Sequence, residues 1–116
     1  MRYKQFQNAD VKVSELGIGT WAIGGVNFGR VDRQGAISAI HEMIDNGVNL
    51  IDTAPVYGNG ASEQIVGEAL RDIPRDQILI STKTGIAPRY PFGTVKNLSY
   101  AEIMREVQSS LMNLKT

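Results

Sequence analysis

The chain contains no cysteine among its 116 residues, which excludes a disulfide framework and a thiolate metal site. Lysine plus arginine number 12, as do aspartate plus glutamate, so the basic excess typical of nucleic-acid-binding faces is missing. The apolar runs are too short to span a bilayer, and the first ten residues lack the apolar core of a secretory signal. We therefore expect a cytoplasmic protein with no thiolate metal site and no nucleic-acid or membrane partner.

The sequence instead contains two regularly alternating kinds of segment. Three short apolar stretches, at 16–24, 47–54 and 77–84, are bounded by turn residues and are typical of strands buried on both faces. They start about 30 residues apart, which is the length of a strand–helix unit. Amphipathic stretches at 32–47 and 62–74 predict helices between them. This alternation predicts a parallel sheet with helices packed outside it.

Signals at the helix ends support this interpretation. Asp32 is placed to cap the first helix, and Gly47 to end it. For the second helix, Ser62 is the candidate cap and Pro74 the candidate terminator.

A third helix is predicted from Ser99 onward. Ser99 and Glu102 have the spacing of a capping box. The apolar stripe expected on this helix consists of Ile103, Val107, Leu111 and Leu114.

The first fifteen residues precede the alternation and have a different pattern. RYKQF, QNAD and VKVSEL follow one another as strand, turn and strand. We expect one domain over 1–116, made of a hairpin over 1–15 followed by three strand–helix units over 16–116.

Two architectures begin with such units: a doubly wound nucleotide-binding sheet and a (β/α)₈ barrel. The dinucleotide fingerprint requires G-x-G-x-x-G between the first strand and its helix. Here Gly17 and Gly19 lie inside the predicted strand, and the next glycines, Gly24 and Gly25, miss the third position. The glycine spacing therefore weakens the open-sheet alternative.

Polar residues at the strand ends favour the barrel. Asp52 ends the second predicted strand and Lys83 the third. In a barrel, the carboxyl ends of the strands and the loops that follow them build the active site. Each residue also has an ordinary interpretation, Asp52 as a turn former and Lys83 as a solvated strand end. On adjacent parallel strands, however, we expect the two side chains to face each other as a buried pair.

Tyr57 lies in the loop directly after Asp52. A phenol gives up its proton reluctantly at neutral pH, and a nearby ammonium group favours the phenolate. We therefore hypothesise that Asp52 anchors Lys83, that Lys83 tunes Tyr57, and that Tyr57 acts as a general acid toward a carbonyl oxygen. The alternative is an ordinary loop aromatic.

The segments LGIGTWAIGG, GVNLIDTAPVYGNGASEQIVGEAL and ILISTKTG resemble the N-terminal part of the aldo-keto reductases. The most specific element is D-T-A-x-x-Y-G followed by S-E-x-x-x-G-x-A-L. The resemblance implies the N-terminal part of a (β/α)₈ TIM barrel whose floor is closed by the hairpin. It also implies an oxidoreductase that reduces small aldehydes or ketones to alcohols with NADPH, with NADH left open, and without metal.

Carried over position by position, the resemblance implies three catalytic residues and a cofactor-binding set. The catalytic residues are Asp52, Tyr57 and Lys83, and the cofactor-binding residues are Gly19, Thr20, Trp21 and Asp52. The loop at 85–97, which carries Arg89, Tyr90 and Phe92, then borders the substrate mouth; a disordered surface loop is equally compatible with its composition.

The sequence departs from the family pattern in one important respect. The fourth catalytic residue of the family, a histidine, is expected after Thr116, and His41 lies in the first predicted helix, where we expect a surface or packing role. Three strand–helix units also leave a barrel unclosed. We therefore expect a fragment that is inactive and self-associating when alone. The fold is also similar to that of potassium-channel β subunits, so a non-catalytic regulatory or assembly subunit, or a truncated remnant, stays as an alternative.

Overall fold

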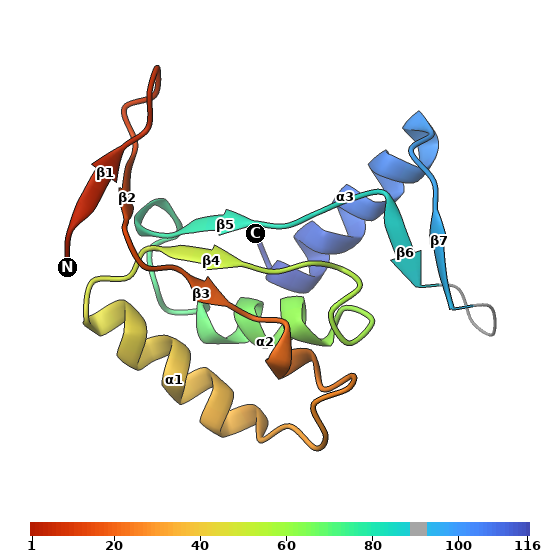
Figure 1. The fold of residues 1–116 in the computed structure, drawn as a ribbon, viewed down its shortest axis with the longest axis horizontal. Coiled ribbons are helices and arrows are strands. Elements are labelled where there is room, and N and C mark those ends of the chain that lie inside the picture. Colours follow the sequence, from red (N-terminus) through yellow and green to blue (C-terminus); the bar gives the residue numbers. More distant parts are fainter. Residues whose placement is uncertain (89–92) are drawn as a thin grey trace.

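A parallel sheet of three short strands lies at the centre of the computed structural model, which describes residues 1–88 and 93–116 (Figure 1). Its strands are β3 (Ile18–Gly19), β4 (Leu50–Asp52) and β5 (Leu79–Ser81), in the order β3-β4-β5. Ile51 pairs with Ile18 on one side and with Ile80 on the other. The predicted parallel sheet is confirmed, although each strand is shorter than its apolar stretch.

Three helices connect and follow these strands: α1 (Arg33–Asp45), α2 (Ala61–Ala69) and α3 (Tyr100–Leu114). Helices α1 and α2 lie on the same side of the sheet, below the strands in Figure 1. Helix α2 packs between α1 and α3. The predicted alternation of strand and helix is therefore confirmed.

The first apolar stretch, 16–24, was expected to be one strand, and this prediction was wrong beyond Gly19. The stretch turns instead into the 3₁₀ helix η1 (Ala22–Gly24), which ends at Gly25 with a φ of 82°. Thr20 is still bonded to β4, because its backbone N–H and side-chain hydroxyl both donate to the carbonyl of Asp52. The strand does not continue, because the carbonyl of Thr20 accepts from Ser62 Oγ and the backbone at Trp21 is helical, with a φ of −60° and a ψ of −46°.

Two antiparallel hairpins flank the parallel sheet. The N-terminal hairpin, β1 (Tyr3–Gln5) with β2 (Lys12–Ser14), confirms the prediction for 1–15. A second hairpin, β6 (Ile86–Pro88) with β7 (Thr94–Lys96), occupies the segment predicted as a loop, so that prediction was wrong. It extends away from the sheet at the right of Figure 1. Arg89, Tyr90 and Phe92, expected near a substrate mouth, lie outside the described residues.

The helix ends agree with the sequence signals for α1 and differ for α2. Asp32 Oδ1 accepts from the N–H of Gly35 at 3.0 Å, and Gly47 follows α1 with a φ of 91°. Ser62, expected as the cap of α2, lies inside the helix, and Gly60 is the N-cap. Helix α2 also ends before Pro74: its last residue is Ala69, and turns follow it. Pro74 precedes a second 3₁₀ helix, η2 (Arg75–Gln77).

Helix α3 begins as predicted but buries a different face. Ser99 Oγ accepts from the N–H of Glu102. Within the predicted stripe Leu114 is buried, whereas Val107 is 37% exposed and Leu111 46% exposed. The apolar stripe of α3 is therefore only partly buried, because the face that α3 turns toward the rest of the chain also contains Glu106 and Ser110.

The core lies between the sheet and the helices α1 and α2. Its main contributors are buried aliphatic side chains: Ile18, Ile37, Ile40, Val48, Ile51, Ile65, Val66, Leu70, Ile78 and Leu114. Ile51, at the centre of the sheet, is 0% exposed. Among the described residues, no helix is long and apolar enough to cross a membrane.

Candidate active site

Asp52 and Lys83 meet at the carboxyl end of the sheet. Asp52 is the last residue of β4, and Lys83 lies two residues beyond β5. The ammonium of Lys83 donates to Asp52 Oδ1 at 2.8 Å, to Asp52 Oδ2 at 2.9 Å and to the carbonyl of Thr53 at 2.8 Å. The predicted pairing across adjacent strands is confirmed.

The pair is not buried, which corrects the expectation. The side chains of Lys83 and Asp52 are 48% and 46% exposed, because both lie at the open end of the sheet. Partial desolvation by itself lowers the pKa of Lys83, but the hydrogen bond and charge of Asp52 outweigh it, so the pKa of Lys83 is raised above its ordinary value. Lys83 is therefore held as a cation at neutral pH.

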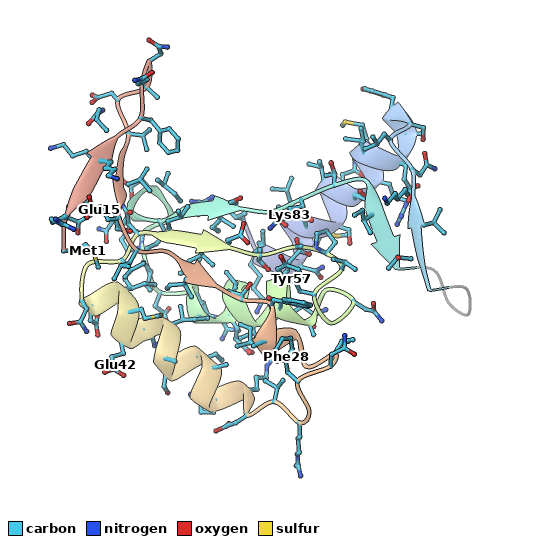
Figure 2. All side chains as sticks on the ribbon, viewed as in Figure 1. Met1, Glu15, Phe28, Glu42, Tyr57 and Lys83 are labelled. Atoms are coloured by element: carbon cyan, nitrogen blue, oxygen red, sulfur yellow. The ribbon has the colours of Figure 1, made fainter. Side chains whose placement is uncertain are left out.

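Tyr57 lies against this ammonium. The Nζ atom of Lys83 is 5.2 Å from the centroid of the Tyr57 ring, and Figure 2 shows the two side chains near each other beyond the strand ends. The charge of Tyr57 and its hydrogen bond also contribute to the raised pKa of Lys83. The three residues expected from the sequence thus form one contiguous group.

Two glycines place the Tyr57 loop. A Cβ atom on Gly24 would lie 2.6 Å from the carbonyl carbon of Tyr57, and one on Gly58 would lie 2.0 Å from the carbonyl oxygen of Gly24. These distances are too short for any side chain, so the loops after β3 and β4 are in direct backbone contact. Gly58 also has a φ of 64°, which favours glycine.

Trp21 stands beside Tyr57 at the same end of the sheet. Its ring is 6.3 Å from that of Tyr57, with an angle of 30° between the planes. Phe28 packs edge-on against Trp21 at 5.3 Å. Trp21 is 56% exposed, so it offers an aromatic surface beside the phenol. Phe28 was not among the residues expected from the sequence.

Gly19 and Thr20, the other two residues of the expected cofactor-binding set, differ in how accessible they are to a ligand. At Gly19 an added Cβ would meet no atom within 4 Å, so the backbone there is open to a ligand. Thr20 is 1% exposed, and its hydroxyl takes part in hydrogen bonds with Asp52 and Ser62. The buried side chain of Thr20 therefore bonds to neighbouring residues of the site. A contact between Thr20 and a cofactor stays a prediction.

Sequence reasoning missed two buried polar residues at the start of α2. Ser62 and Glu63 are both 0% exposed. Ser62 Oγ donates toward Thr20 at 2.8–2.9 Å and contacts Thr53 Oγ1 at 3.0 Å. The signal was the Ser-Glu pair at the start of the second predicted helix, in which Ser62 was interpreted as a cap and Glu63 was given no role of its own.

His41 is remote from this group. It lies on α1, and its Nε2 is 2.6 Å from the carbonyl oxygen of Ala69 in α2, which agrees with the expected packing role. Within residues 1–88 and 93–116, no group of three or more His, Asp or Glu side chains is arranged to hold a metal ion.

Comparison with known proteins identifies the family of this chain. Residues 15–116 match the model of the aldo/keto reductase family. The chain belongs to the aldo/keto reductase family. Its three short strands and the helices beside them are therefore part of a (β/α)₈ barrel, as the strand-end polar residues had indicated.

Individual relatives agree with this assignment. The chain is 39% identical to the aldo-keto reductase YhdN of Bacillus subtilis, with 100% of this chain and 35% of the relative covered. It is 46% identical to the NADH-specific methylglyoxal reductase of Escherichia coli, with 90% and 36% covered. The aldo-keto reductase AKR11C1 from Bacillus halodurans, in its holo form, superposes with a TM-score of 0.87 at 34% identity, with 100% and 37% covered.

Two further matches bear on cofactor and role. An aldo-keto reductase of Klebsiella pneumoniae in complex with NADPH is 32% identical, with a TM-score of 0.72 over 92% of this chain and 33% of that one. A probable voltage-gated potassium channel subunit beta of Arabidopsis thaliana is 38% identical over 98% of this chain and 34% of its own length. The chain thus spans about a third of the length of these relatives.

Proposed function

We propose that this chain carries part of the active site of an oxidoreductase that reduces small aldehydes or ketones to alcohols, with Tyr57 as the proton donor. The observation that carries the proposal is the contiguous group of three side chains. Both oxygens of Asp52 hold the ammonium of Lys83, and that ammonium lies 5.2 Å from the Tyr57 ring.

Each residue has a distinct task in this reaction. The Tyr57 O–H donates its proton to the carbonyl oxygen of the substrate, so that the oxygen becomes a hydroxyl and Tyr57 a phenolate. The positive charge of Lys83 stabilises that phenolate. Asp52 keeps Lys83 in place and charged. Because the group lies at the open end of the sheet, Tyr57 can recover its proton from solvent.

The residues at this end of the sheet also fit a nicotinamide cofactor. The open backbone at Gly19, the exposed face of Trp21 and the half-exposed carboxylate of Asp52 are a suitable set of apolar and hydrogen-bonding contacts. A reduced nicotinamide bound there supplies the hydride for the carbonyl carbon. We propose NADPH, in a cytoplasmic setting, and NADH is the alternative because one relative is named as NADH-specific.

The test is Tyr57→Phe in the protein as its source cell makes it. General acid catalysis contributes about 10²- to 10⁴-fold, so we expect NADPH-dependent carbonyl reduction to fall by that factor. Binding of NADPH, followed by fluorescence quenching of Trp21, the one tryptophan of this 116-residue sequence, is expected to persist. Tyr100→Phe is the matched control, since Tyr100 is 80% exposed on α3. Unchanged turnover in Tyr57→Phe would refute the assignment.

A second candidate is a cofactor-binding subunit that regulates or assembles with another protein. The similarity to the potassium-channel β subunit of Arabidopsis thaliana favours it. This candidate predicts that NADPH quenches Trp21 fluorescence while the wild-type protein turns over none of a panel of small aldehydes and ketones. Measurable turnover in the wild type would exclude a purely non-catalytic role.

A further inference from the structure

Glu63 is the one carboxylate among the described residues with 0% exposure. It lies in the first turn of α2, and each of its oxygens accepts one hydrogen bond. Oε1 accepts from the hydroxyl of Thr82 at 2.8 Å, and Oε2 accepts from the amide of Asn113 at 3.0 Å. Glu63 therefore connects α2 to the segment after β5 and to α3.

Such a residue is costly to bury. A carboxylate removed from water needs hydrogen bonds to compensate for lost hydration, and both partners of Glu63 are neutral. Its place in the first turn of a helix, near the positive end of the dipole, offsets part of this cost. A leucine would bury the same volume more cheaply. Unlike leucine, the carboxylate fixes the orientation of the Thr82 hydroxyl and the Asn113 amide, which both donate to it.

One of those groups adjoins Lys83. The strand β5 ends at Ser81, so Thr82 and Lys83 lie beyond the hydrogen bonds of the sheet. The side chain of Thr82 is drawn toward α2 by Glu63, whereas that of Lys83 reaches Asp52. Successive side chains of an extended segment point to opposite sides. The bond between Glu63 and Thr82 therefore turns Lys83 toward Asp52.

The neighbouring residue holds the other half of the pair. Ser62 Oγ contacts Thr20 and Thr53, the residue after Asp52, and the carbonyl of Asp52 accepts from Thr20. Two consecutive buried residues in α2 thus support the Asp52 side and the Lys83 side separately. Glu63 is the support on the Lys83 side.

We propose that Glu63 is a positioning residue that orients Lys83 toward Asp52 and Tyr57 by holding Thr82. Its relevance to catalysis rests on the carbonyl reduction proposed above. The orientation of Lys83 is measurable without any activity, so the two proposals can fail separately.

The decisive variant is Thr82→Val, which removes the hydroxyl and keeps the shape. The titration of Lys83 is followed by NMR of protein that is isotopically labelled at the lysine side-chain carbons. The Lys83 signal is assigned as the one that is missing from the spectrum of Lys83→Arg. In wild type we expect a pKa above the ordinary lysine value, as the contact with Asp52 requires. In Thr82→Val we expect a lower pKa, because Lys83 is then free to leave Asp52. A folded Thr82→Val protein in which Lys83 titrates as in wild type would overturn the proposal.

The matched control is Thr84→Val, the same change two residues along at an exposed position, which should leave the titration of Lys83 unchanged. Glu63→Gln still accepts from Thr82 and should retain the raised pKa, whereas Glu63→Ala should lose it. If Glu63→Ala fails to fold, Thr82→Val decides the question. A lowered pKa in Thr84→Val as well would assign the effect to general loosening of the segment and would also overturn the proposal.

Kinetics of the intact enzyme give a second readout. Displacement of a catalytic group by about 1 Å costs on the order of 100-fold in rate, so Thr82→Val should lower kcat by about 10- to 100-fold. KM should stay near its wild-type value, because Thr82 is not placed in the binding surface. A change in KM alone would contradict a positioning role.

Discussion

Helices α2 and α3 have similar sequence patterns and very different surroundings. Each was predicted from an apolar stripe. In α2 the stripe is buried completely: Ile65, Val66, Ala69 and Leu70 are at most 9% exposed. In α3 the large exposed side chains include Met104, Val107, Leu111 and Met112. The difference teaches that an apolar stripe in the sequence predicts which face of a helix is apolar. Whether that face is buried depends on the elements packed against it. Helix α2 lies between α1 and α3.

The buried face of α3 is partly polar. Glu106 and Ser110 are 4% and 3% exposed. Glu106 Oε2 accepts from the N–H of Gly85 at 2.6 Å, whereas Glu106 Oε1 and Ser110 Oγ are without a hydrogen-bond partner in the described part of the chain. Unsatisfied buried groups cost stability. Helix α3 is therefore held less firmly than α2, and the following changes test this contrast.

The largest effect is expected from matched truncations on the two helices. Ile65→Ala in α2 removes a side chain that is 3% exposed and should lower the free energy of unfolding by about 2–5 kcal/mol. Leu111→Ala in α3, at 46% exposure, should change it by about 0.5 kcal/mol or less. Urea denaturation followed by circular dichroism measures both. Equal losses would mean that the two helices are packed alike.

A smaller loss is expected where the two helices touch. A Cβ atom on Gly67 would lie 2.4 Å from the carbonyl oxygen of Asn113, so Gly67→Ala must push α3 away from α2. Overpacking of this kind costs about 1–3 kcal/mol, which outweighs the roughly 1 kcal/mol by which alanine improves helix propensity. Gly19→Ala is the control for stability, because no atom lies within 4 Å of its added Cβ. A Gly67→Ala protein as stable as wild type would contradict the close contact.

The exposed face of α3 should affect association more than folding. We expect the 116-residue chain to self-associate through apolar side chains such as Val107 and Leu111 and through the free edges of β3 and β5. The double change Val107→Lys and Leu111→Lys should lower the sedimentation coefficient toward that of a monomer. The double change Gln34→Lys and Ser38→Lys, at exposed polar positions of α1, adds the same two charges and serves as the charge control. A wild-type chain that sediments as a monomer would refute the expectation.

The smallest effect concerns pH and the Asp52–Lys83 pair. The pKa of Lys83 is raised in the folded chain, so the pair stabilises the fold below the ordinary lysine pKa and loses this contribution as pH rises through the raised value. Because both side chains are about half exposed, the contribution should stay below about 1 kcal/mol. Denaturation at pH 8 and at a pH above the folded pKa should show this loss in wild type, and it should be absent in Lys83→Met.

Much of the fold was predictable because its signals are local. Alternation of apolar and amphipathic segments depends on the periods of strand and helix, and Asp32 and Gly47 mark helix ends by chemistry within one turn. The hairpin β6–β7 was missed because its first strand, Ile86–Pro88, contains a proline, which argues against a strand in the sequence. The early end of β3 was missed because it involves a hydrogen bond from Ser62 to the carbonyl of Thr20, 42 residues away.

In the candidate site, too, some features could be predicted from the sequence and others could not. Asp52, Tyr57 and Lys83 were identifiable from the sequence by itself, since their chemistry and their places after apolar strands are visible in the chain. Only the tertiary structure showed that Gly24 meets Gly58 and that Glu63 holds Thr82, because these contacts join segments that fold together from distant positions. It also decided that Asp52 and Lys83 are half exposed. A sequence pattern specifies which side chains share a face, whereas the packing of neighbouring elements decides how much water reaches them.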